Sequence, residues 1–135
     1  MKRFFGILIA ITSLAVTAQA QKLKAANIPA PVKAAFMKLH PNVKVSWEKE
    51  KQNYEAGFSI NGKETSEVYT AAGTLVETEV EIKTSELPAA VLTKLKNMKI
   101  AEAAKITRAN GTIIYEAEVK GKDLLFEANG EALKP

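Results

Sequence analysis

An internal repeat places the strongest constraint on how this chain can fold. Four short sequences of the first half return in the same order in the second half. They are Ile28–Val32, Tyr54–Ala56, Gly62–Glu64 and Ala72–Gly73, which return as Leu87–Val91, Tyr115–Ala117, Gly121–Asp123 and Asn129–Gly130. Self-similarity at a roughly constant offset indicates a duplicated supersecondary unit. The chain is therefore predicted to contain two repeats, residues 21–84 and 85–135, which fold as one joint domain.

Each repeat begins with a helical pattern. In the first, Val32, Phe36 and Leu39 have the spacing of one apolar helix face, and His40-Pro41 ends the helix. In the second, the same kind of stripe is predicted for Val91, Leu92, Leu95 and Met98. Both stripes are expected to pack on a sheet.

Alternating apolar and polar residues follow each helix, which is the pattern of half-buried strands. Val43, Val45 and Trp47 alternate with polar residues, and Asn61-Gly62 is a strong signal for a tight turn. Strands joined by such short turns are antiparallel. The predicted fold is therefore α+β: tandem helix-plus-antiparallel-meander repeats forming one sheet, with both helices on one face and the other face in water.

The first twenty residues have the pattern of a secretory signal peptide. Lys2 and Arg3 precede an apolar run from Phe4 to Val16, and Ala18-Gln19-Ala20 supplies small residues for cleavage before Gln21. The run is shorter than the roughly 20 apolar residues of a membrane-spanning helix. We therefore expect residues 1–20 to be removed and the mature protein to be periplasmic or secreted, without a membrane anchor.

Composition excludes several classes of function. The chain has no Cys, which rules out a disulfide scaffold and thiol chemistry, and its 19 basic residues fall to 17, against 15 acidic ones, when Lys2 and Arg3 are removed. Lys and Glu alternate along the mature part and form no basic patch, so nucleic acid is not an expected partner. A single histidine, His40, and the absence of a Gly-x-Ser-x-Gly motif leave no candidate catalytic residue and no expected cofactor.

The sequence resembles the PepSY-like exported proteins of Bacteroidetes-type bacteria, which are also described as similar to beta-lactamase inhibitor proteins. The resemblance lies in Leu39–Asn42, Val45–Glu50, Tyr54–Phe58, Glu67–Tyr69 and Leu87-Pro88. It implies tandem helix-plus-sheet repeats and supplies no catalytic residue. It also implies that an exported peptidase is a possible kind of partner. Thr70–Gly73 departs from the aspartate-rich turn of the family, which weakens the case for a metal in that turn.

Glutamates on the expected open sheet face are the candidate binding residues: Glu55, Glu77, Glu79, Glu81 and Glu116. Alternate residues of a strand lie about 6–7 Å apart, too far to converge on one ion, so no metal site is predicted. The row is interpreted as a solvated face or as a docking surface for a basic partner. Trp47 belongs either to the core, as its alternation with Val43 and Val45 favours, or to the binding face as an anchor.

These observations predict an exported non-enzymatic binding module that inhibits or restrains an exported protein, such as a peptidase or another hydrolase, through its open sheet face. One alternative is an envelope structural or stress protein that binds ions or cell-wall glycans. Another is an enzyme that uses carboxylates alone, such as a glycosidase, which needs two carboxyl groups about 5–10 Å apart in a cleft. The sequence does not determine the oligomeric state.

Overall fold

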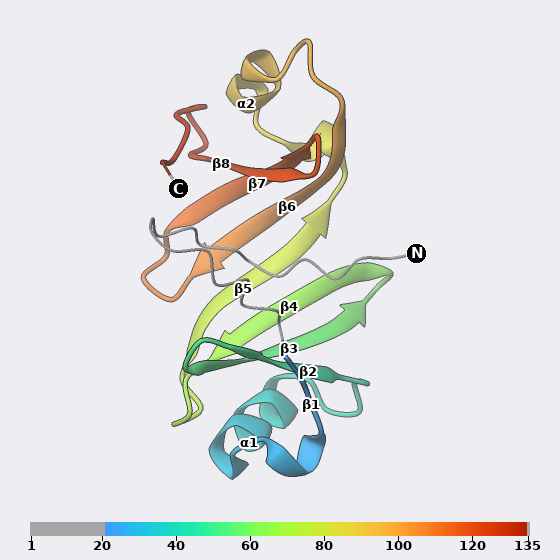
Figure 1. Cartoon of the computed structure of the whole chain (residues 1–135), viewed down its shortest axis with the longest axis vertical. Helices are drawn as coiled ribbons and strands as arrows, with labels where there is room; N and C mark the ends of the chain where they lie inside the picture. Colours follow the sequence, from blue (N-terminus) through green and yellow to red (C-terminus); the bar gives the residue numbers. More distant parts are fainter. Residues whose placement is uncertain (1–20, 135) are drawn as a thin grey trace. The chain divides into compact units, whose positions relative to one another are not determined.

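The computed structural model describes residues 21–134 (Figure 1), so the predicted signal peptide lies outside the described residues. The predicted α+β class is confirmed: the strands follow one another in sequence order, β1 to β8, in one eight-stranded antiparallel sheet. None of the helices among residues 21–134 is long and apolar enough to cross a membrane. The strands are β1 (Gln21–Leu23), β2 (Ser46–Glu50), β3 (Asn53–Ile60), β4 (Lys63–Tyr69), β5 (Leu75–Ile82), β6 (Ile100–Arg108), β7 (Ile113–Val119) and β8 (Lys122–Phe126). The helices are α1 (Ala30–Leu39) and α2 (Ala89–Lys94), preceded by the 3-10 turns η1 (Ala25–Asn27) and η2 (Thr84–Glu86).

The described chain forms two compact units, each with its own helix and strands, and their boundary falls inside β5 after Thr78. Unit 1 therefore contains α1 and β1–β4, and unit 2 contains α2 and β6–β8. Each unit contains the helix that the repeat predicted, which follows β1 and η1 in unit 1 and the end of β5 and η2 in unit 2. That both helices lie on one face of a joint domain stays a prediction.

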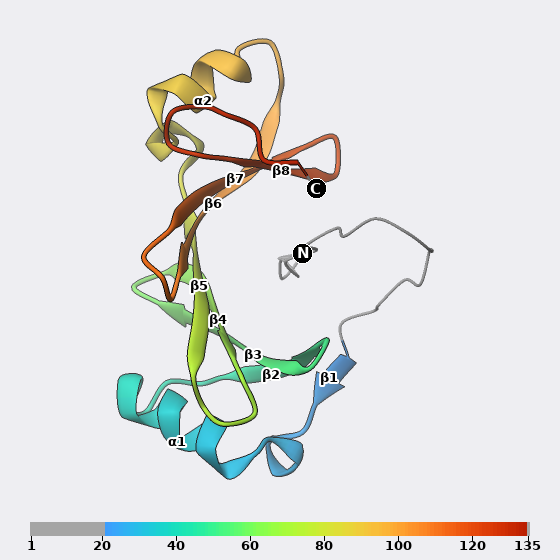
Figure 2. The same cartoon turned by 90° about the vertical axis from the view of Figure 1, so that its left-hand side faces the viewer.

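The core of unit 1 lies between α1 and the strands on which it packs (Figure 2). Val32 and Phe36 of α1 are buried against Trp47 of β2 and against Ala56 and Phe58 of β3. The Phe36 ring meets the Trp47 ring edge-on at 5.5 Å, a preferred geometry for aromatic pairs. Trp47 is 5% exposed and therefore belongs to the core, so its alternative placement on the open face is wrong.

The core of unit 2 repeats this plan with smaller side chains. Val91 of α2 and Leu95, the residue that caps its end, are buried against Ala103 of β6, Ala117 of β7 and Phe126 of β8. Ala103, which pairs with Ala117, stands where unit 1 has Trp47 paired with Ala56, and α2 is the shorter helix. Both cores form on the helix-facing side of their strands, as the alternating pattern predicts.

One glycine in each unit lets a turn approach the start of the helix. Gly73 has a φ of +85°, and a Cβ at this position would lie 2.5 Å from the carbonyl oxygen of Pro31. Gly130, with a φ of +86°, stands in the same relation to Ala90 at 2.9 Å. Both positions therefore require glycine for conformation and for space.

Three local expectations are wrong. Leu39 and Met98, placed on the buried helix stripes, are 53% and 50% exposed. Leu39 is the last residue of α1, and Met98 lies beyond the end of α2 at Lys94. Strand β2 begins at Ser46 and not at Val43, because the chain leaves α1 through a turn in which Asn42 has a φ of +65°.

Candidate functional site

The sheet face opposite the helix in unit 1 carries a group of carboxylates. Since Ala56 faces α1, its neighbour Glu55 on β3 projects from the other side. The register places Glu55 between Glu48 of β2 and Val68 of β4. We call this surface, defined by Glu48, Glu55 and Val68, the helix-distal face of unit 1.

Glu55 is a buried carboxyl group among other acidic side chains. Its side chain is 6% exposed, and burial, together with the charges of Glu50 and Glu48, raises its pKa to about 7. Burial and the neighbouring Glu77 also raise the pKa of Glu50. At neutral pH Glu55 therefore exists in comparable amounts with and without its proton, which is unusual for a glutamate.

Unit 2 repeats the arrangement at the corresponding position. Glu116 of β7 pairs with Ala104 of β6 and Leu125 of β8, and these three residues define the helix-distal face of unit 2. Glu116 is 3% exposed. Ile106 and Ile114, paired across the same face, are also buried. The duplicated Tyr-Glu-Ala sequence thus places one glutamate on the helix-distal face of each unit.

Four of the five predicted glutamates are therefore not on a solvated surface. Glu55, Glu77, Glu79 and Glu116 are buried, and only Glu81 is exposed. Burial reaches the carboxylate groups themselves, since Oε2 of Glu79 and Oε1 of Glu116 are inaccessible to solvent. Glu81 lies near the end of β5, next to its last residue, Ile82. A binding role for the five residues stays a prediction.

A polar network in the core of unit 1 was not predicted. His40, at the end of α1, lies with Nε2 2.9 Å from Oε1 of Glu67 on β4. The hydroxyl group of Tyr69 donates a hydrogen bond to the other carboxylate oxygen of Glu67. Burial and the contact with Glu67 raise the pKa of Tyr69. The network ties the end of the helix to the sheet, and no nucleophile belongs to it.

The sequence contains one signal for this network. Glu67 and Tyr69 are two positions apart on a strand and therefore share a face. Its partner His40 is 27 positions away from Glu67, so only the fold brings the two together. The His40 ring also packs against Phe36 and Phe58, with centroids 5.1 and 4.6 Å away.

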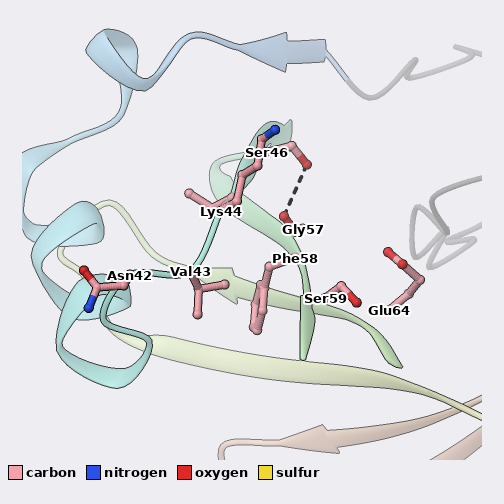
Figure 3. Close-up of a pocket in the computed structure, with 9 residues that line it drawn as sticks. Asn42, Val43, Lys44, Ser46, Gly57, Phe58, Ser59 and Glu64 are labelled. Carbon is pink, nitrogen blue, oxygen red and sulfur yellow. Dashed lines mark hydrogen bonds between the residues drawn. The ribbon is translucent and has the colours of Figure 1, made fainter. Parts of the chain in front are cut away.

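Unit 1 also contains a groove beside β3 (Figure 3). It has a volume of about 480 Å³ and lies between the segment Asn42–Ser46 and the strand residues Gly57–Ser59, with Glu64 at one end. Val43 and Phe58 both line it and point in the same direction, and Ser46 Oγ donates a hydrogen bond of 3.3 Å to the carbonyl group of Gly57. Among residues 21–134, no group of three or more His, Asp or Glu side chains is positioned to hold a metal ion.

These features define a small α+β protein with a duplicated glutamate on the helix-distal faces of its two units. Solved structures with this fold include a DUF2874 family protein from Bacteroides uniformis, with a TM-score of 0.70 and 23% identity over 78% of this chain and 86% of that one. A presumed periplasmic protein of Bacteroides eggerthii gives a TM-score of 0.71 and 24% identity, over 78% of this chain and 86% of that one.

A BLIP-like protein from Bacteroides fragilis gives a TM-score of 0.63 and 25% identity, over 78% of this chain and 84% of that one. The resemblance found in the sequence, to exported proteins similar to beta-lactamase inhibitor proteins, is thus confirmed for the fold. No family model matches the chain, and no curated protein matches its sequence.

Proposed function

We propose that this chain is an exported, non-enzymatic binding module that restrains an exported partner, such as a peptidase or another hydrolase. The observation that carries the proposal is the duplicated glutamate, Glu55 and Glu116, on the helix-distal face of each unit. Two copies of a helix-plus-sheet unit each retain a carboxyl group where an apolar side chain would be less costly to bury. A binding role accounts for this cost.

The proposed partner presents a basic side chain to the carboxyl groups. Glu55 is short of compensating positive charge, since Glu48 and Glu50 raise its pKa. A lysine or arginine of the partner, placed beside Glu55, would favour its ionised form. Binding should therefore release a proton near pH 7 and weaken as the pH falls below the pKa of Glu55.

Export is supported by the charged, apolar and small-residue pattern of residues 1–20. The presumed periplasmic location of the Bacteroides eggerthii protein, which has the same fold, is consistent with it. The BLIP-like description of the Bacteroides fragilis protein favours a partner-binding role over catalysis. The partner class itself is our proposal.

A pull-down from the exported fraction of the host tests the function. The bait is the mature protein, residues 21–135, compared with a bait carrying Glu55→Gln and Glu116→Gln, which keeps shape and removes charge. Glu127→Gln, at an exposed position outside both helix-distal faces, is the matched control. We expect one stoichiometric partner that is retained by the control bait and lost from the double variant.

Isothermal titration in two buffers of different ionisation enthalpy then measures the proton released on binding. Equal capture by all three folded baits would refute the role of Glu55 and Glu116. Capture of no protein, with retention on cell-wall glycans, would support the envelope-protein alternative.

A further inference from the structure

We infer that the open backbone edge of β3 at Ser59 accepts an extended segment of a partner polypeptide, which adds to unit 1 as a short strand. The inference rests on the proposed function and adds to it a second contact, of different chemistry, away from Glu55 and Glu116. It follows from a difference between the two repeats.

The β3–β4 hairpin of unit 1 is longer than its counterpart. It runs from the pair Tyr54–Tyr69 to the pair Ile60–Lys63, whereas β7–β8 runs only from Tyr115–Phe126 to Val119–Lys122. In unit 2, β6 pairs with β7 as far as the last residue of β7, at the pair Ile100–Val119. In unit 1, β2 pairs with β3 only as far as Ser46–Gly57. The end of β3, Phe58–Ile60, therefore has β4 on one side and no strand on the other.

The register shows which backbone groups face the open side. A two-residue turn, Asn61-Gly62, makes Ile60 and Lys63 the pair that exchanges hydrogen bonds. Because the direction alternates along a strand, Phe58 also turns its backbone groups toward β4, and Gly57 and Ser59 turn theirs away. The hydrogen bond from Ser46 Oγ to the Gly57 carbonyl group agrees with this direction. The N–H and C=O of Ser59 therefore point into the groove.

The segment that lines the other side of the groove does not complete the ladder. No backbone hydrogen bond among the described residues joins Asn42–Val45 to Phe58–Ile60. The chain diverges there because it arrives from α1 through the turn at Asn42. Unpaired edge groups of this kind pair readily with another extended chain.

The lining of the groove defines the occupant. A residue opposite Ser59 would lie between Ser59 and the segment that carries the exposed side chain of Lys44, whereas Glu64 lies one strand further away, on the β4 side of Ser59. An acidic side chain therefore fits there. The two residues beside it would point to the other face, toward Val43 and Phe58, and should be apolar. The occupant is therefore an extended segment with the pattern apolar–acidic–apolar.

The test uses the peptide acetyl-Thr-Val-Glu-Val-Thr-amide and amide spectra of the ¹⁵N-labelled mature protein. We expect concentration-dependent shifts confined to residues 42–46 and 57–60. Ser59→Pro should weaken binding about tenfold, because it removes the donor N–H. The variant should stay folded, since that N–H makes no bond to β4 and proline is tolerated at such edges. Ser59→Ala, which keeps the N–H, should bind as the parent does.

A charge exchange checks the direction of the contact. Lys44→Glu should weaken binding of this peptide and favour the peptide with Lys at the central position. Unchanged spectra at millimolar peptide, or equal binding by the Ser59→Pro and Ser59→Ala variants, would overturn the inference. Protection of the Ser59 amide that grows with protein concentration alone would also overturn it, because the occupant would then be a second copy of the chain. A partner captured as proposed above together with a failed peptide titration would refute only the edge contact.

Discussion

At the residue scale, the molecule is marked by ionisable groups held where charge is costly. Glu55 lies among Glu48, Glu50 and Glu77, and its pKa is raised to about 7. Glu67 lies in the core of unit 1 but has two hydrogen-bond partners, His40 and Tyr69. The negative charge of Glu55 is thus poorly compensated by its neighbours, whereas both carboxylate oxygens of Glu67 have hydrogen-bond partners within unit 1. This contrast separates a candidate binding residue from a structural one.

The raised pKa of Glu55 predicts how stability depends on pH. The unfolded chain releases this proton near pH 4.5, and the folded protein keeps it to about pH 7. Between these values the folded state holds more protons, so the free energy of unfolding falls as the pH rises. Glu55→Gln should therefore be more stable than the parent at pH 8, by up to about 3 kcal/mol, and similar to it at pH 4.

Urea unfolding of the parent, Glu55→Gln and the exposed-site control Glu127→Gln at both pH values measures this effect. Glu50 has a raised pKa as well, so part of the pH dependence should remain in Glu55→Gln. Identical differences between parent and Glu55→Gln at pH 4 and pH 8 would contradict the prediction.

The Glu67 network predicts a large effect from removing one hydroxyl group. Tyr69→Phe leaves a buried carboxylate oxygen without its donor and should lower the free energy of unfolding by about 1–3 kcal/mol. Tyr54→Phe is the matched control, because Tyr54 is the cross-strand partner of Tyr69 and its ring packs under Lys49. This control should change stability by less than about 0.5 kcal/mol. The free energy of unfolding is measured by chemical denaturation. Equal losses in Tyr69→Phe and Tyr54→Phe would show that the Tyr69 hydroxyl group does not contribute to stability.

At the element scale, each unit depends on a turn that touches the start of its helix. Gly73 and Gly130 make this contact, to Pro31 and Ala90 respectively. The unit is thus closed at one end by backbone-to-backbone packing, and the β4–β5 turn cannot accept a side chain there. The repeat of this contact explains why glycine recurs at these two positions of the sequence.

Alanine substitution separates the two reasons for glycine at these positions, which are the left-handed backbone conformation and the lack of space for a Cβ. Gly73 and Gly111 have the same φ, +85°, but a Cβ would meet Pro31 only at Gly73 and nothing within 4 Å at Gly111. Both variants should lose about 1 kcal/mol for the left-handed backbone, and Gly73→Ala should lose roughly 1–3 kcal/mol more for the overlap. Thermal unfolding of both variants measures the difference. Melting temperatures that agree within error would show that α1 moves aside at no cost.

At the scale of the whole molecule, duplication explains both the regularity of the fold and the place of its differences. The two units share the helix, the tight turns and the glutamate on the helix-distal face. They differ in the length of one hairpin. In unit 1 the end of β3 has no strand beside it on the β2 side, whereas in unit 2 β7 is paired with β6 to its end. A surface present in one copy of a repeat is where a distinct contact can develop without loss of the shared fold.

The sequence by itself determined the repeat, the α+β class, the tight turns and most strand positions, because these follow from local periodicity and turn chemistry. It also placed Glu55 and Glu116 at corresponding positions. Only the tertiary structure decided that these side chains are buried, that His40 meets Glu67 across 27 positions, and that β2 stops before the end of β3. Burial, pairing and strand length depend on contacts between residues far apart in the chain, which no local pattern encodes.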